Sequence, residues 1–84
     1  MPDDLSHRTD RKLSPGWRSP LGATLGLGGV NFSLYSATAE EVWLLLFDRP
    51  DGNPTDIIRV QERNRFAWHV FVHGAGAEIG RAHV

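Results

Sequence analysis

The chain has 84 residues, with 9 Lys and Arg against 10 Asp and Glu, and a formal net charge of -1. The chain is therefore long enough for one small domain at most. The balanced charge argues against a protein that binds nucleic acid or another polyanion electrostatically. Cysteine is absent, which excludes disulfides and thiolate metal sites. The polar start lacks the apolar stretch of a secretory signal, and the longest apolar run has 6 residues, so we expect a soluble, cytoplasmic protein that does not cross a membrane.

The first third of the chain shows no long periodic pattern. Residues 1–14 are polar and charged, which predicts a disordered lead-in. Turn signals at residues 14–16 and 19–20 bracket Trp17, which we expect to pack on the domain as a local anchor. Residues 21–29 are glycine-rich and predict an irregular approach to the first strand. No helix is predicted after them, which argues against a phosphate-cradling loop.

Two strands are predicted next. In residues 30–36, apolar Val30, Phe32 and Leu34 alternate with polar neighbours, the pattern of a half-buried strand. Residues 41–48 predict a second strand that is apolar on both faces. Such a strand is normally covered on both sides. Because so short a chain has little left to cover the second face, we interpret it as part of a larger protein.

Two further strands are predicted at residues 55–60 and 66–72, joined by a charged turn at residues 61–65. Short strands separated by turn signals, with no helical period, predict an all-β fold: an antiparallel immunoglobulin-like β-sandwich. The sandwich is expected to be incomplete, because such domains normally have about seven strands. Its predicted span is residues 15–76, and residues 77–84 are expected to be an irregular or non-native tail.

The strand faces divide the apolar residues into two groups. The inward group is the predicted core: Val30, Phe32, Leu34, Val42, Leu44, Leu46, Trp68 and Val70. The apolar residues left over are Trp43, Leu45, Phe47 and Phe71, which are candidates for docking on another domain. For Trp43, docking, stacking on a sugar ring and ordinary packing all remain open. Trp17 is a local anchor with a flat ring that could also stack on glucose.

We predict no metal site, cofactor site or catalytic residue. His69 and His73 have the spacing of helical zinc ligands, but on a strand they would be roughly 13 Å apart. No pair of carboxylates offers the fixed framework that glycoside hydrolysis needs.

Three blocks of the sequence resemble a known family. Residues 20–24 (PLGAT) and 29–36 (GVNFSLYS) are similar to the "PLGAT … GVNFALFS" opening of bacterial glycogen debranching enzymes and isoamylases. Residues 41–48 (EVWLLLFD) resemble the next block, "VELCLFD", and residues 68–74 (WHVFVHG) resemble the following one, "WHGYLPG". The order and spacing of the blocks agree over about residues 15–76.

The resemblance implies the N-terminal β-sandwich called carbohydrate-binding module family 48, which precedes a catalytic TIM barrel of glycoside hydrolase family 13. Such enzymes hydrolyse α-1,6 branch linkages in glycogen or its limit dextrins. The implied partners are an α-glucan and the barrel of the same protein, with no nucleic acid and no membrane. The family's catalytic Asp and Glu lie in the barrel, so no residue here inherits a catalytic role. Two alternatives remain: a stand-alone glycan-binding module and an immunoglobulin-like protein-interaction module.

Overall fold

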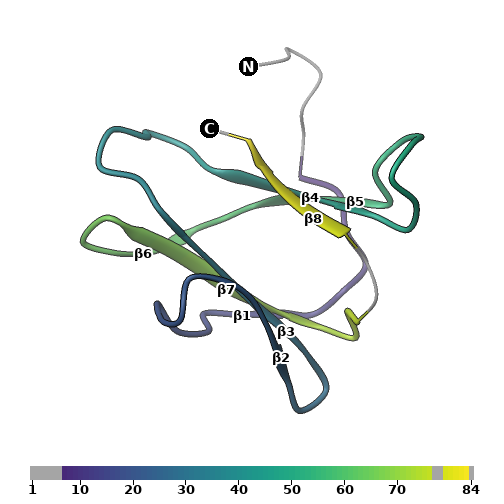
Figure 1. The fold of residues 1–84 in the computed structure, drawn as a ribbon, viewed down its shortest axis with the longest axis horizontal. Helices are drawn as coiled ribbons and strands as arrows, with labels where there is room; N and C mark the ends of the chain where they lie inside the picture. The colour runs from purple at the N-terminus through teal and green to yellow at the C-terminus, as the bar shows by residue number, and fades with distance from the viewer. Residues whose placement is uncertain (1–6, 77–78, 84) are drawn as a thin grey trace.

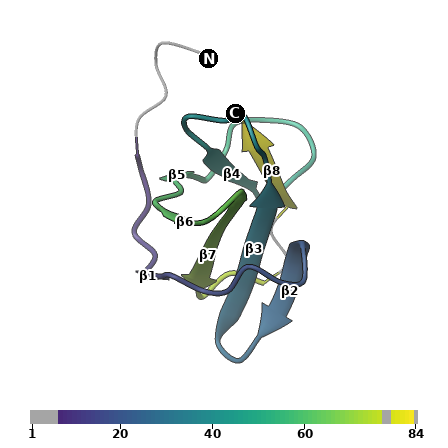
Figure 2. The same ribbon diagram turned by 90° about the vertical axis from the view of Figure 1, so that its left-hand side faces the viewer.

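The computed structural model describes residues 7–76 and 79–83, without the side chains of Ile79 and His83. The described residues form two antiparallel β-sheets that face each other, with no helix among them (Figures 1 and 2). This confirms the predicted all-β sandwich. The strands, in chain order, are β1 (Leu13–Ser14), β2 (Gly22–Gly26), β3 (Gly29–Tyr35), β4 (Trp43–Phe47), β5 (Asp56–Arg59), β6 (Glu62–Asn64), β7 (Ala67–His73) and β8 (Ile79–His83).

The two sheets differ in width. The larger sheet has the order β1-β7-β3-β2, with the short β6 also paired to β7, and the smaller sheet has the order β5-β4-β8. β3 and β7 form the centre of the larger sheet and pair along their whole length, from Gly29 opposite His73 to Tyr35 opposite Ala67. β4 is the centre of the smaller sheet.

The four predicted strands correspond to β3, β4, β5 and β7, with ends that differ by one or two residues. The predicted irregular stretch 21–29 and charged turn 61–65 are wrong, because each contains a strand that forms a tight hairpin with the next one. β2 pairs with β3 across a two-residue turn in which Gly28 has a φ of 84°. β6 pairs with β7 across a second two-residue turn, in which Arg65 has a φ of 59°. Positive φ angles in such turns match the twist of the flanking strands.

The predicted irregular tail at residues 77–84 is also wrong where the structure describes it. Ile79–His83 forms β8, which pairs antiparallel with β4 from Phe47 opposite Ile79 to Trp43 opposite His83. The N–H and C=O groups of a strand edge can pair with any non-proline backbone. A weak side-chain pattern therefore does not prevent pairing. Residues 77, 78 and 84 lie outside the described residues.

Residues 7–14, the described part of the predicted disordered lead-in, are ordered, so the prediction is wrong for them. We name this segment the N-terminal strap. Arg8 exchanges two backbone hydrogen bonds with Ile57 of β5, at 2.6 and 2.8 Å. Further along, Leu13–Ser14 pairs with β7 as β1. The strap therefore contacts both sheets. The prediction failed because polar side chains and backbone groups hold the strap, and such contacts produce no hydrophobic period in the sequence. Residues 1–6 lie outside the described residues.

A cluster around Asp56 holds the middle of the strap. Thr9 donates a hydrogen bond to the Asp56 carboxylate at 2.5 Å, Thr55 donates another at 2.8 Å, and the Arg11 guanidinium lies 3.4 Å away. Arg11 also donates to the Gly74 carbonyl at 2.6 Å. Burial raises the pKa of Asp56, but the hydrogen bonds from Thr9 and Thr55 and the charge of Arg11 outweigh it, so that the pKa lies below its ordinary value of 3.8.

The core lies between the sheets and agrees with the predicted inward faces. Leu46 and Ile58 are fully buried, and every predicted core residue belongs to the central cluster or packs against it. The cluster consists of Val30, Val42, Leu44, Leu46, Ile58, Val60, Trp68, Val70, Val72 and Ala75, with Leu13, Phe32, Leu34 and Ala39 packed against it. Trp68 is thus a core residue. Ile58 and Val60, from the predicted strand at residues 55–60, are core residues too.

We predict that Leu44→Ala destabilises the fold by about 2–5 kcal/mol, because Leu44 is buried in the core and alanine leaves a cavity. The matched control is Leu27→Ala, the same change at a fully exposed side chain, which should leave stability unchanged. Chemical denaturation followed by circular dichroism measures both. Equal stability of the two variants would show that the inner face of β4 has been wrongly assigned.

The Asp56 cluster predicts a specific pH dependence. Because the pKa of Asp56 is lowered by folding, its contribution to stability is complete above the unfolded-state pKa and is lost as pH falls through the lower folded-state pKa. The free energy of unfolding of Asp56→Asn should therefore fall less steeply than that of the unchanged protein between about pH 5 and pH 2. The matched control is Asp51→Asn, the same substitution in an exposed loop. Parallel profiles for all three proteins would contradict the assignment.

Candidate glycan-contact and docking surfaces

The five candidate residues lie on the outer faces of two different sheets. Trp43, Leu45 and Phe47 belong to the outer face of β4 in the smaller sheet. Phe71 lies on the outer face of β7 in the larger sheet, and Trp17 lies in the loop that crosses it. The structure therefore does not bring the five residues together, and it offers two separate surfaces.

The surface on the smaller sheet is more covered than the sequence predicts. Trp43 is 7% exposed and Phe47 is 9% exposed, while Leu45 is partly buried. Of the three roles left open for Trp43, stacking on a sugar ring has little exposed ring surface to use. β8 and β5 flank β4 on both edges, so that Leu45 has Arg81 on one side and Ile57 on the other, and the Arg81 guanidinium lies 5.2 Å from the centre of the Phe47 ring. Leu45 is the most accessible of the three.

The surface on the larger sheet is built by residues 15–20, which we name the tryptophan loop. The side chain of Asn31, fully buried on β3, accepts a hydrogen bond from the Trp17 N–H at 3.0 Å and donates one to the Trp17 carbonyl at 2.9 Å. Ser33 donates to the Arg18 carbonyl at 2.7 Å. The polar outward residues of the first predicted strand thus hold the loop flat on the sheet.

The loop can lie this close because of a glycine. Gly16 has a φ of 70°, and a Cβ atom at this position would clash with the Asn31 amide oxygen and with the Phe71 backbone nitrogen, 2.9 Å away. The left-handed conformation and the close approach both require glycine.

The loop presents the ring of Trp17 to solvent. The ring stacks on Phe71 with 5.5 Å between ring centres and 29° between planes, and His73 meets Phe71 edge-on at 4.8 Å. Phe71 is buried beneath, but Trp17 remains 48% exposed. This confirms Trp17 as an anchored residue. One of its faces rests on the sheet, and a large part of the ring stays available to a ligand.

His69 and His73 take separate partners. His69 Nδ1 lies 2.6 Å from the Pro15 carbonyl, to which it donates, and His73 Nε2 lies 2.6 Å from the Ser14 hydroxyl. Each histidine fastens the chain around β1 and the tryptophan loop to β7. In residues 7–76 and 79–83, no three His, Asp or Glu side chains gather as metal ligands.

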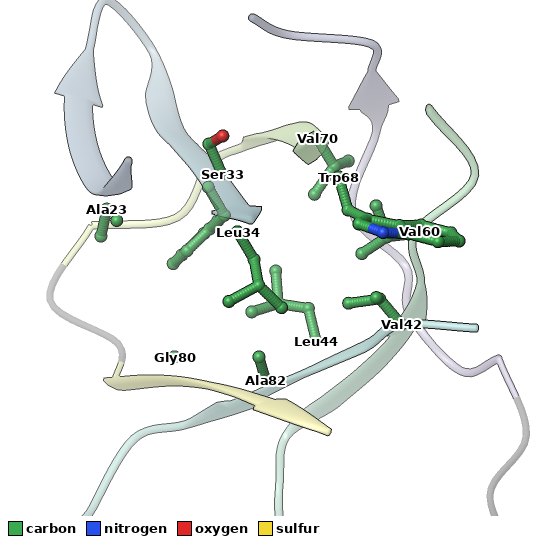
Figure 3. Close-up of a pocket in the computed structure, with 12 residues that line it drawn as sticks. Ala23, Ser33, Leu34, Val42, Leu44, Val60, Trp68, Val70, Gly80 and Ala82 are labelled. Atoms are coloured by element: carbon green, nitrogen blue, oxygen red, sulfur yellow. The ribbon is translucent and has the colours of Figure 1, made fainter. Parts of the chain in front are cut away.

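Two features escaped the sequence reasoning. The first is a set of exposed leucines on and beside β2: Leu21, Leu25 and Leu27. Their alternation with glycine and small residues is a period-of-two signal that could have revealed the strand. The second is a mostly apolar cavity of about 180 Å³ between the sheets, whose lining includes Trp68, Val42 and Ala82 (Figure 3). A cavity between two sheets cannot be predicted from a sequence pattern. Within the described residues, no helix is long and apolar enough to cross a membrane.

Comparisons with known proteins show which proteins this chain is similar to. The family model of carbohydrate-binding module 48 (isoamylase N-terminal domain) matches residues 20–82. A glycogen debranching enzyme of Cronobacter sakazakii is 42% identical over 64 residues, and the match covers 76% of this chain and 9% of the enzyme. Isoamylase 1 of Oryza sativa subsp. japonica, a chloroplastic enzyme, is 41% identical over 81 residues, covering 88% of this chain and 10% of the enzyme. The chain therefore spans about a tenth of the length of these relatives.

The fold has a counterpart among solved structures. A pullulanase from Paenibacillus barengoltzii, solved in complex with maltohexaose and α-cyclodextrin, superposes with a TM-score of 0.70 and 22% sequence identity over 81% of this chain and 11% of the pullulanase chain. At this identity the likeness concerns the fold. The family model matches three quarters of the sequence and names the kind of β-sandwich that this is. The chain belongs to the carbohydrate-binding module 48 family, the isoamylase N-terminal domain.

Proposed function

We propose that this chain serves as the N-terminal module of an isoamylase-type glycogen debranching enzyme, which hydrolyses α-1,6 branch linkages in an α-glucan. The observation that carries the proposal is the family match over residues 20–82, together with relatives named glycogen debranching enzyme and isoamylase at about 40% identity. The module's work is to dock on the catalytic barrel of the same protein and to extend its glucan-binding cleft. Catalysis belongs to the barrel.

The two outer surfaces suit the two parts of this work. On the smaller sheet, Leu45 is the most accessible residue of an apolar face that it forms with Trp43 and Phe47, which suits docking on a second domain. On the larger sheet, Phe71 supports Trp17 from beneath. The exposed Trp17 ring suits the glucan, because the apolar C–H face of a glucose ring packs well on a flat aromatic face.

A stand-alone glycan-binding module is the second candidate, and the same ring favours it. The stacked pair of Trp17 and Phe71 needs no residue from another domain. Reading the coding sequence beyond the codon for Val84 separates the two candidates. A following barrel with an Asp and a Glu at strand ends supports the debranching enzyme, whereas a stop codon in the native gene favours the stand-alone module.

We predict that Trp17→Ala weakens binding of maltohexaose by about tenfold or more, because it removes the exposed stacking surface. Isothermal titration calorimetry on the full chain measures the change. The control is Tyr35→Ala, which removes another exposed aromatic ring. Tyr35 lies four residues beyond Asn31 on β3, roughly 13 Å along the strand, and this variant should bind as the unchanged protein does. Equal losses in both variants, or no loss in either, would contradict a glucan site at Trp17.

A second prediction concerns how the ring is held. Asn31→Ala leaves the Trp17 ring in the chain but removes both hydrogen bonds that fix its backbone. We expect weaker maltohexaose binding with a larger entropic cost, since the loop must then be ordered on binding. The variant also loses stability, because backbone groups of the loop lose their partners. Unchanged affinity and entropy would show that the tryptophan loop needs no support from Asn31.

A further inference from the structure

The N-terminal strap and the tryptophan loop are one continuous segment, residues 7–20, and it is fastened to the sheets at short intervals. Four of its residues have backbone groups bonded to one of the sheets: Arg8, Lys12, Pro15 and Trp17. Successive fastenings lie two to four residues apart. Because an extended chain spans only about 3.3–3.6 Å per residue, the stretches between them have little slack. Movement at one fastening is therefore passed on to the next.

The segment joins the two sheets. Arg8 is bonded to Ile57 of β5, in the smaller sheet, whereas the later fastenings are on β7 and β3 of the larger sheet. Figure 2 shows the segment running from beside β5 to β1 and then across the larger sheet. The position of the tryptophan loop on the larger sheet therefore depends in part on an attachment to the smaller sheet.

Asp56 is the centre of that attachment. Its buried carboxylate accepts hydrogen bonds from Thr9 of the strap and from Thr55, and it pairs with Arg11 of the strap at 3.4 Å. Arg11 in turn donates to the carbonyl of Gly74, directly after β7. Arg11 therefore clamps the strap between β5 and the end of β7, and loss of the Asp56 charge removes the ion pair from this clamp.

We propose, on the basis of the glucan site proposed at Trp17, that Asp56 is a positioning residue for the Trp17 ring. Acting through the strap, Asp56 holds the tryptophan loop in the conformation that receives a glucose ring. A loop that is ordered in advance binds at a smaller entropic cost than one that its ligand must order. Because coupling between two sites is reciprocal, a glucan on Trp17 also tightens the attachment of the strap to β5. The glucan surface thus responds to any change that releases the strap.

Maltohexaose titrations with the full chain test this positioning role. Asp56→Asn removes the charge of the carboxylate but keeps the size of the side chain, and it should weaken maltohexaose binding about fivefold or more. The matched control is Glu41→Gln, which removes a carboxylate charge paired with Arg59 at the same distance, 3.4 Å, outside the Asp56 cluster. Glu41→Gln should bind as the unchanged protein does. Isothermal titration calorimetry measures both affinities.

A double-mutant cycle separates positioning from a general loss of stability. Asn31→Ala already releases the tryptophan loop from β3. Adding Asp56→Asn to this variant should therefore cost less affinity than Asp56→Asn costs alone. A carboxylate that only stabilises the fold would lower the affinity by the same factor in both backgrounds.

Amide hydrogen exchange tests the connection between the strap and the loop without a ligand. The Trp17 N–H donates to the Asn31 side chain, so its exchange reports opening of the loop. Relative to amides of β3 and β7, it should exchange faster in Asp56→Asn than in the unchanged protein, and at the original rate in Glu41→Gln. With saturating maltohexaose, the Arg8 N–H, which holds the strap on β5, should exchange more slowly in the unchanged protein.

Thr9→Val removes the strap's hydroxyl while keeping its shape, and it takes the place of Asp56→Asn if circular dichroism shows that the latter does not fold. Unchanged affinity and unchanged Trp17 exchange in a folded variant would overturn the positioning role, as would an equal loss of affinity in Glu41→Gln. If the unchanged protein does not bind maltohexaose, the glucan site at Trp17 fails instead. Faster Trp17 exchange in Asp56→Asn then still supports the hold of Asp56 on the loop, and an equal rate overturns it.

Discussion

The pairing of β3 with β7 is the constraint on which the rest of the structure depends. Seven consecutive residue pairs, from Gly29–His73 to Tyr35–Ala67, fix which side chains point in and which point out. A shift of one residue would move every side chain to the other face. Inward, the pair supplies Val30, Trp68 and Val70 to the core. Outward, it places Asn31 beside Phe71, and this neighbourhood holds the tryptophan loop and its exposed ring.

The outward side of this pair shows how a polar residue can be structurally decisive. Asn31 is completely buried although it faces away from the core, because the tryptophan loop lies over it. Both hydrogen-bonding ends of its amide meet backbone groups of Trp17, so its burial leaves no unpaired group. The surface proposed for glucan is thus built on a hydrogen-bonded base rather than on an apolar one.

The parts of the fold that could be predicted are those with a hydrophobic period. Alternation along residues 30–36 and 66–72 predicted β3 and β7 and most of the core, because burial of one face requires it. β6 and β8 were missed because backbone pairing with a neighbour holds them, and Glu62–Asn64 is exposed throughout. In the site, Trp17 was predicted as an anchor. For Trp43, the sequence left docking, sugar stacking and packing open, because a hydrophobic period does not show what covers an outer face; the structure shows that its side chain is covered.

The N-terminal strap has a consequence for the order in which the fold is made. Its partners come late in the chain: Arg8 pairs with Ile57, and Leu13 pairs with Val72. During synthesis the strap is therefore made before either partner, and its backbone groups cannot form these bonds until both partners have been made. Contacts between such distant residues form slowly because a long loop must close first. A segment that is made before its partners is thus among the last to reach its final position.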